Sequence, residues 1–162
     1  MGDSRRFDLF GALIARNLHR EMHIADIAAG KGFLRANLYE RGFRSITSWD
    51  KRPKQAKNRS GYRYGYFDYR TAPDYDAVVA MHPDGGTDQA IFYAGQRRVP
   101  AIICPCCAIG SATVYWGPRG QYQAWIAHLL KLAEKLSLEV THTALPMTGR
   151  NEVLILRPQS NR

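Results

Sequence analysis

No stretch of this 162-residue sequence is apolar over the roughly 20 residues that a membrane span needs. Hydrophobic residues still make up 45% of the chain, which is enough for one globular domain with a core. The first residues, Met-Gly-Asp-Ser-Arg-Arg, lack the apolar region of a secretory signal. We therefore expect a single domain covering residues 1–162, in a cytoplasmic protein with no membrane partner.

Cysteine is scarce, and its three copies are Cys104, Cys106 and Cys107. An odd number of cysteines in one cluster is a poor disulfide framework. Their spacing also lacks the Cys-x-x-Cys pairs of common zinc sites. His82 would complete a metal site if the fold brought it near, but small buried thiols at a strand end are the favoured interpretation. We therefore predict no metal site.

Acidic residues are outnumbered by basic ones, 14 against 23, and the net charge is +9. The basic residues gather between positions 51 and 70, where tyrosines lie among them. Cations that bind phosphates, next to rings that stack on bases, are typical of a nucleic-acid surface, although a solvated loop is the alternative. The residues predicted to contact RNA in this segment are Lys54, Lys57, Arg59 and Arg63.

Residues 24–32 read Ile-Ala-Asp-Ile-Ala-Ala-Gly-Lys-Gly and predict a buried strand that runs into a tight turn. A helical pattern starts at Phe33, and the next predicted strand ends just before Asp50. In an α/β sheet such a turn forms a nucleotide-type pocket, and an acid at the next strand tip can accept from both ribose hydroxyls. The alternative is an ordinary connection whose glycines serve only the turn.

The same loop lacks the signatures of a phosphate site. Position 35 is arginine, so the Gly-x-Gly-x-x-Gly pattern is not met, and Gly32 stands where a P-loop needs serine or threonine. A pyrophosphate ligand is therefore not expected, and a nucleoside without phosphate fits better.

Hydrophobic periodicity predicts an α/β fold. The predicted helices are 5–20, 33–41, 88–96 and 121–136, and the predicted strands are 23–29, 45–49, 63–69, 75–81, 99–104, 138–145 and 152–156. Thr87 is expected to N-cap the third helix. A turn at residues 147–151 makes the last two strands an antiparallel pair. This order predicts a mostly parallel sheet with a C-terminal antiparallel hairpin.

From Phe7 to Leu156 the chain resembles the class I, Rossmann-like S-adenosylmethionine-dependent methyltransferases. Residues 26–32 are similar to the family's first motif, with Ala28 where glycine is usual. Asp50 matches the ribose-binding acid, and Asp68 matches a position that often contacts the adenine amino group. The resemblance implies S-adenosylmethionine as cofactor. The residues implied to bind it are Asp26, Ala28, Ala29, Gly30, Gly32, Asp50, Lys51, Asp68, Tyr69 and Met81.

Two shorter motifs resemble the Trm13-type tRNA 2′-O-methyltransferases. Residues 82–88, His-Pro-Asp-Gly-Gly-Thr-Asp, are similar to their His-Leu-Cys-Gly…Thr-Asp motif, and Pro-Cys-Cys at 105–107 is similar to their double cysteine. Asp84 stands where that family has cysteine. Ala108 and Ile109 stand where it has histidines.

His82 is the first candidate for a catalytic base, because it follows a predicted buried strand and the ordinary pKa of histidine, about 6.5, suits neutral pH. Asp84 is the second candidate. The alternatives are a structural hydrogen bond for His82 and a turn role for Asp84. Three residues in a glycine-rich segment are expected either to cover the acceptor or to pack the sheet edge: Tyr115, Trp116 and Arg119.

We therefore expect a methyltransferase that acts on tRNA or rRNA. No Asn-Pro-Pro-Tyr motif is present, which favours an oxygen or carbon acceptor over an exocyclic amine. The alternatives are a small-molecule methyltransferase and a non-catalytic accessory subunit that binds cofactor or RNA. A methyl-carrying Cys107, a homodimer and a partner protein also remain open.

Overall fold

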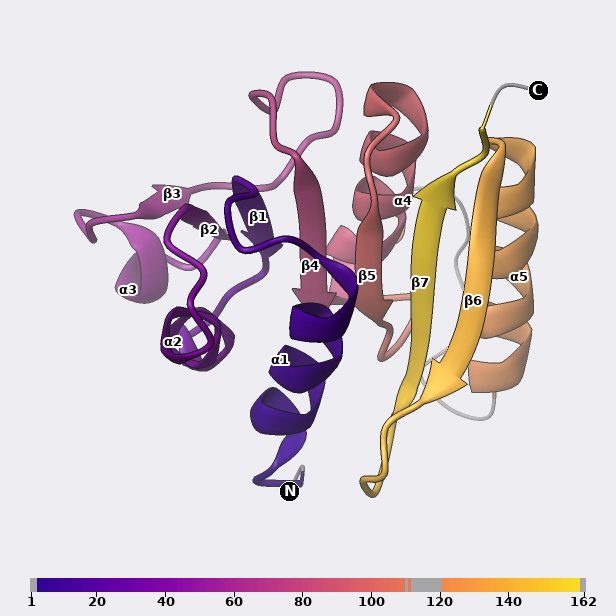
Figure 1. Cartoon of the computed structure of the whole chain (residues 1–162), viewed down its shortest axis with the longest axis horizontal. Helices are drawn as coiled ribbons and strands as arrows, with labels where there is room; N and C mark the ends of the chain where they lie inside the picture. The colour runs from indigo at the N-terminus through magenta and orange to yellow at the C-terminus, as the bar shows by residue number, and fades with distance from the viewer. Residues whose placement is uncertain (1–2, 110, 112–120, 161–162) are drawn as a thin grey trace.

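One seven-stranded sheet forms the centre of the molecule, with the strand order β3-β2-β1-β4-β5-β7-β6 (Figure 1). The computed structural model describes residues 3–109, 111 and 121–160. The strands are β1 (Ile24–Ile27), β2 (Ile46–Asp50), β3 (Tyr62–Tyr64), β4 (Ala77–Met81), β5 (Ala101–Cys104), β6 (Leu138–Ala144) and β7 (Glu152–Pro158). The first five strands are parallel, and β7 pairs antiparallel with β5 and β6. The predicted sheet and its C-terminal hairpin are confirmed.

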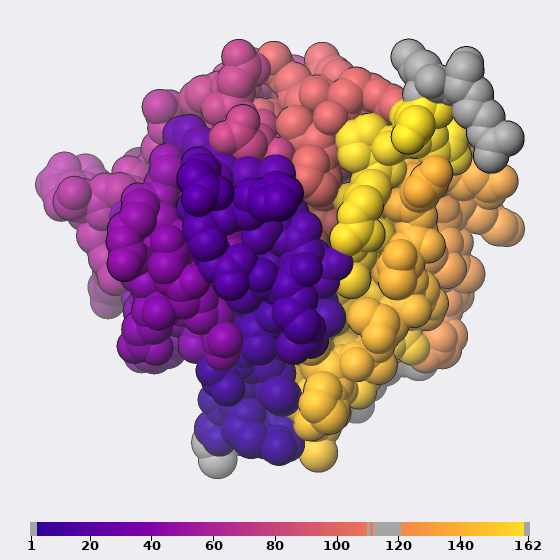
Figure 2. Space-filling model, in the orientation of Figure 1, coloured from indigo at the N-terminus to yellow at the C-terminus, as the bar shows by residue number. Residues whose placement is uncertain are grey.

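Helices cover both faces of this sheet. They are α1 (Arg6–Asn17), α2 (Phe33–Glu40), α3 (Pro53–Ala56), α4 (Thr87–Arg97) and α5 (Tyr122–Lys135), and a 3-10 turn, η1, spans Asp84–Gly86. The helices α1 and α2 lie in front of the sheet in Figure 1, whereas α4 and α5 pack on its other side. On the front face, β6 and β7 lie beside α1 without a helix over them (Figure 2). No helix in the described part of the chain is long and apolar enough to cross a bilayer.

The central strands are buried on both faces. Every residue of β1, β4 and β5 is buried. Successive side chains of a strand point to opposite faces, so Val79 joins the core under α1 and α2, whereas Val78 and Ala80 join the core under α4 and α5. Because both faces are covered, a parallel strand here needs a mainly apolar run, which is the pattern that predicted these strands; Asp26 in β1 is the one charged residue among them.

Two local predictions were wrong. The third strand ends at Tyr64, short of the predicted residue 69, because Gly65 has φ +136° and turns the chain out of the sheet. Thr87 does not cap α4, because the preceding 3-10 turn makes it the first helical residue. Its hydroxyl instead donates to the carbonyl of Asp84 at 3.1 Å.

Candidate functional site

Residues 28–32 form a tight loop between β1 and α2. Ala28, Gly30 and Gly32 have left-handed backbones, with φ of +57°, +57° and +88°. The N–H of Gly32 donates to the carbonyl of Ala29 at 3.0 Å and closes the turn. Glycine adopts this conformation readily, whereas alanine at position 28 costs about 1–2 kcal/mol. The predicted turn is thus present, with alanine at one of its left-handed positions.

Asp50 joins this loop from the tip of β2. Its Oδ2 accepts a hydrogen bond from the N–H of Gly30 at 2.8 Å, and its side chain is almost fully buried. Burial by itself raises the pKa of Asp50, but hydrogen bonds from Arg52 and from the Gly30 N–H outweigh it and lower the pKa. The structure therefore brings together the loop and the acid that the sequence singled out, and keeps the acid ionised.

Arg52 covers the carboxylate of Asp50. Its Nε donates to Oδ1 at 2.9 Å and its Nη2 donates to Oδ2 at 2.8 Å. The side chain of Arg52 is 57% exposed, so it can turn into solvent without disturbing the core. A ribose diol that donates to Asp50 must displace this guanidinium, while the bond from Gly30 can persist.

Asp26 lies behind the loop, fully buried in β1. Its Oδ2 accepts a hydrogen bond from the hydroxyl of Ser48, its register partner on β2, at 3.2 Å. Burial raises the pKa of Asp26 to about 7, and the Ser48 bond and the charge of Arg35 offset this only in part. Asp26 therefore links β1 to β2 through a buried hydrogen bond, and its contact with the cofactor stays a prediction.

The other predicted cofactor residues differ in how exposed their side chains are. Met81 is buried at the end of β4, and the Nζ of Lys51 lies 5.1 Å from the ring centroid of exposed Tyr66. Because β3 is short, Asp68 lies in the loop after it and not at a strand end, which corrects its predicted placement. The guanidinium of Arg70 donates to its carboxylate at 2.9 Å and 3.0 Å.

Tyr69 is attached to α4. Its N–H donates to the Oε1 of Gln89 at 3.2 Å, and its ring stacks on Phe92 with a centroid separation of 5.0 Å. This places the backbone of residues 68–69 firmly on the helix that follows β4. Within the described part of the chain, the carboxylate of Asp68 bonds to Arg70 and not to Asp50 or the loop after β1, so its contact with adenine stays a prediction.

His82 follows β4 in a strained conformation. Its φ is +51°, and φ is +46° at Asp84; such values in non-glycine residues often mark functional sites. The Nε2 of His82 lies 2.7 Å from the carbonyl of Arg150, which can only accept, so Nε2 carries a hydrogen. Burial lowers the pKa of His82. The imidazole is therefore neutral at neutral pH, and Nδ1 is its basic atom.

Asp84 contacts two thiols that arrive from the end of β5. Its Oδ1 lies 3.1 Å from the Sγ of Cys106 and 3.5 Å from the Sγ of Cys107, and the two sulfurs are 3.6 Å apart. Burial and the Asp84 carboxylate raise the pKa of Cys106. Cys104 is the small buried thiol that we predicted, whereas Cys106 and Cys107 are only half-buried.

The basic stretch, residues 51–70, presents its lysines and arginines to solvent, as a binding surface requires. Lys54, Lys57 and Arg63 are exposed on and after α3, at the β3 edge of the sheet. The guanidinium of Arg59 lies 4.1 Å from the ring centroid of Tyr62 and donates to the carbonyl of Lys31 at 3.0 Å. The basic stretch is therefore tied to the loop after β1. Tyr115, Trp116 and Arg119 lie outside the described residues.

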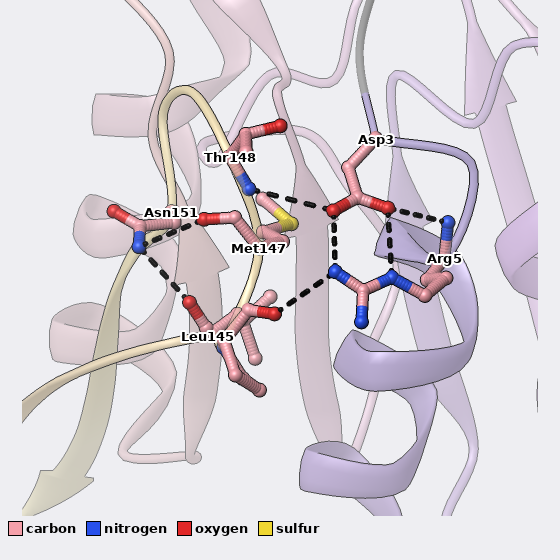
Figure 3. Close-up of polar contacts among 7 residues, drawn as sticks. Asp3, Arg5, Leu145, Met147, Thr148 and Asn151 are labelled. Atoms are coloured by element: carbon pink, nitrogen blue, oxygen red, sulfur yellow. Dashed lines mark hydrogen bonds and ion pairs between the residues drawn. The ribbon is translucent and has the colours of Figure 1, made fainter.

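Sequence reasoning missed a contact between the N-terminus and the β6–β7 turn (Figure 3). The Nη2 of Arg5 donates to the Asp3 carboxylate at 2.8 Å and to the carbonyl of Pro146 at 3.3 Å. Asp3 also accepts from the N–H of Thr148 at 3.4 Å. Because His82 bonds to Arg150 in the same turn, the turn borders the site. No local pattern signals contacts between residues more than 140 positions apart.

Next to this contact lies a cavity of about 520 Å³ between the start of α1 and α2. Arg6, Asp8 and Glu40 bring charge to its lining, and Phe7 and Phe33 bring aromatic surface. Phe33 directly follows the loop after β1, so the cavity adjoins the predicted cofactor turn. Its size lies within the usual range for small-molecule pockets.

Solved methyltransferases share this fold. The magnesium protoporphyrin IX methyltransferase of Synechocystis PCC 6803, with bound S-adenosylmethionine, matches 94% of this chain and 77% of its own at 12% identity, with a TM-score of 0.63. A TehB-like S-adenosylmethionine-dependent methyltransferase from Corynebacterium glutamicum matches 94% and 88% at 16% identity, with a TM-score of 0.59. The chain has the methyltransferase fold. The ribosomal protein L11 methylase of Lactobacillus delbrueckii subsp. bulgaricus matches 97% and 81% at 13% identity, with a TM-score of 0.61.

These identities are low, so the likeness establishes the methyltransferase fold and not a substrate. No family model and no curated protein matches the chain. The expected fold class is therefore confirmed, whereas the Trm13-type resemblance gains no support from the comparisons.

Proposed function

We propose that this chain is an S-adenosylmethionine-dependent methyltransferase that acts on RNA. The observation that carries the proposal is the hydrogen bond from the N–H of Gly30 to Asp50, which joins a left-handed loop to a ribose-type acid at the carboxyl ends of β1 and β2. The pair lies at the carboxyl edge of the parallel strands, and this position supports the proposal because ligands of open α/β sheets bind at that edge.

The residues present fit the cofactor. Asp50 is buried and ionised, and its second partner, Arg52, is free to move into solvent. The loop after β1 has no phosphate signature, in keeping with a nucleoside that carries no phosphate. When bound, S-adenosylmethionine supplies an electrophilic methyl group on a sulfonium.

His82 is the base that we assign to the reaction. Its Nε2 is held by the carbonyl of Arg150 at 2.7 Å, so Nδ1 is the atom that takes the acceptor proton. The acceptor oxygen then bonds to the methyl carbon as the carbon–sulfur bond breaks, and the sulfonium becomes a neutral thioether. Asp84 is less suited to this role, because its carboxylate faces Cys106 and Cys107.

Calorimetric titration with S-adenosylmethionine tests the cofactor assignment. We expect binding to the unaltered chain and at least about a tenfold weaker affinity in Asp50→Ala, because losing one charge-assisted hydrogen bond costs about 1.5–3 kcal/mol. Asp74→Ala is the matched control, since Asp74 pairs with Arg97 and its side chain is 89% exposed. A folded chain that releases no heat with millimolar cofactor would contradict the proposal.

The basic stretch supports RNA as the substrate. Exposed cations alternate there with exposed rings, among them Tyr64 and Tyr66, which are 53% and 76% exposed. Phosphate contacts together with base stacking are how proteins bind single-stranded RNA. The bond from Arg59 to the carbonyl of Lys31 connects this surface with the cofactor loop.

Neutralising two of these cations should weaken RNA binding and reduce its salt dependence. For Lys54→Gln/Lys57→Gln we expect the slope of log affinity against log salt to fall by about 1–2, because each phosphate contact contributes about 0.7–0.9. Lys131→Gln/Lys135→Gln on α5 is the control, with the same charge change at exposed positions. Equal slopes in the two double variants, measured by fluorescence anisotropy, would count against this surface.

A small-molecule acceptor is the second candidate, favoured by the 520 Å³ cavity between α1 and α2. Methyl incorporation from labelled cofactor into total RNA, compared with incorporation into RNA-free metabolite extract, separates the two substrates. Label found only in the metabolite fraction would replace RNA by a small acceptor and leave the cofactor assignment intact.

A further inference from the structure

We propose that Asp84, Cys106 and Cys107 bind a zinc-class divalent metal ion. The carboxylate oxygen and the two sulfurs all lie within 4.8 Å of one another. This inference goes beyond methyl transfer and does not depend on it. The spacing of the three cysteines predicted no metal site, because it lacks the Cys-x-x-Cys pairs of common zinc sites.

The separations fit the corners of a metal tetrahedron. Zinc bonds of about 2.3 Å to sulfur and about 2.0 Å to oxygen place two sulfurs about 3.8 Å apart and a sulfur about 3.5 Å from an oxygen. In the structure the sulfurs are 3.6 Å apart, and the Oδ1 of Asp84 lies 3.1 Å and 3.5 Å from them. An ion at the centre therefore requires movements of only a few tenths of an ångström.

The ligands are held in place by paired strand ends. Met81 of β4 is the register partner of Cys104 of β5, and the N–H of His82 donates to the carbonyl of Cys104 at 2.9 Å. The chain then leaves each strand, and φ is +46° at Asp84. The Oδ1 of Asp84 then lies within 3.5 Å of both sulfurs, so the three donor groups are already gathered.

The donor set selects the kind of ion. Thiolates are soft ligands that favour zinc, and they disfavour magnesium and calcium, which prefer oxygen. Asp84 is exposed and both cysteines are half-buried, so an ion can enter from solvent. The three ligands found among the described residues would leave the fourth tetrahedral position for a further ligand, such as water or a substrate atom.

Cobalt(II) titration of the full-length, reduced and metal-free chain tests the site. We expect one equivalent to bind with a thiolate-to-cobalt charge-transfer band, and zinc to displace it. Cys106→Ser and Cys107→Ser should each weaken the band and lower the affinity by at least about tenfold, since even outer-shell partners contribute that much. Asp84→Asn should lower the affinity similarly but retain the band, because both thiolates remain.

Cys104→Ser is the matched control, because Cys104 is buried and its Sγ lies 3.5 Å from the carbonyl of Arg150. This variant should bind cobalt like the unaltered chain, with circular dichroism reporting that each variant is folded. The proposal is overturned if folded unaltered chain shows no band, if the Cys106→Ser/Cys107→Ser double variant keeps it, or if Cys104→Ser loses it. The proposal is also overturned if, on exposure to air in the presence of cobalt, Cys106 and Cys107 form a disulfide with each other and the chain takes up no cobalt.

Discussion

Replacing Gly32 with alanine lowers the affinity for S-adenosylmethionine by about tenfold, whereas the same change at Gly149 leaves it nearly unchanged. A Cβ at position 32 would lie 2.0 Å from the hydroxyl of Tyr62, and φ there is +88°. Gly149 has φ +87°, but nothing lies within 4 Å of its Cβ position. The two variants therefore share the backbone strain of about 1–2 kcal/mol and differ in the steric clash.

To relieve the clash, either the ring of Tyr62 or the loop after β1 must move, and a shift of the loop weakens its contact with Asp50. Gly30 donates to Asp50 from the same turn, so moving the loop away from Tyr62 breaks the geometry on which ribose binding depends. Calorimetry with the cofactor measures the difference, and circular dichroism verifies the fold. Equal affinity in Gly32→Ala and Gly149→Ala would show that the loop does not form the cofactor site.

The Asp26→Asn variant becomes progressively more stable than the unaltered protein as pH rises from about 4 to 7. Burial raises the pKa of Asp26 from 3.8 to about 7, so the folded chain keeps a proton that the unfolded chain has already lost. Folding is therefore favoured at low pH, and this contribution is lost as pH rises through the folded pKa. A pKa difference of about three units between the folded and unfolded states corresponds to at most about 4 kcal/mol in the free energy of unfolding.

Urea denaturation at intervals from pH 4.5 to 8 measures this effect as the difference in free energy of unfolding between Asp26→Asn and the unaltered chain. Subtracting one curve from the other removes the contribution of His82 and most of that of Asp50, whose charge also raises the pKa of Asp26. Asp74→Asn is the control, because it makes the same change from acid to amide at a side chain that is 89% exposed. A flat difference for Asp26→Asn would mean that its carboxyl titrates normally despite burial.

Much of the fold was predictable because the hydrophobic pattern of a short segment indicates which of its residues are buried. Unbroken apolar runs identified β4 and β5, an apolar run interrupted only by Asp26 identified β1, and the turn residues 147–151 identified the hairpin of β6 and β7. The loop after β1 and Asp50 were also found in this way. The errors were local too: Gly65 ended β3 early, and the 3-10 turn before α4 displaced Thr87 from the cap.

The candidate site was predictable only in part, because several of its contacts depend on neighbours in space. The spacing of Asp84 and Cys106 carries no metal signature, yet the pairing of β4 with β5 brings them to 3.1 Å. The sequence also did not predict that the guanidinium of Arg52 donates to the carboxylate of Asp50, because this bond depends on the rotamer of the arginine. The assignment of the hydrogen to Nε2 of His82 likewise rests on Arg150, 68 positions away.

By itself the sequence determined the α/β class, the parallel core strands and the turn that carries Gly30, because each depends on the periodicity of a short segment. The tertiary structure alone decided three things. It placed the β6–β7 turn beside His82, it gathered Asp84 with the two thiols, and it opened the cavity between α1 and α2. For the first two the physical reason is strand order, because only the complete sheet determines which chain ends meet at its carboxyl edge. For the cavity it is the packing of α1 beside α2, which are separated in the sequence by β1.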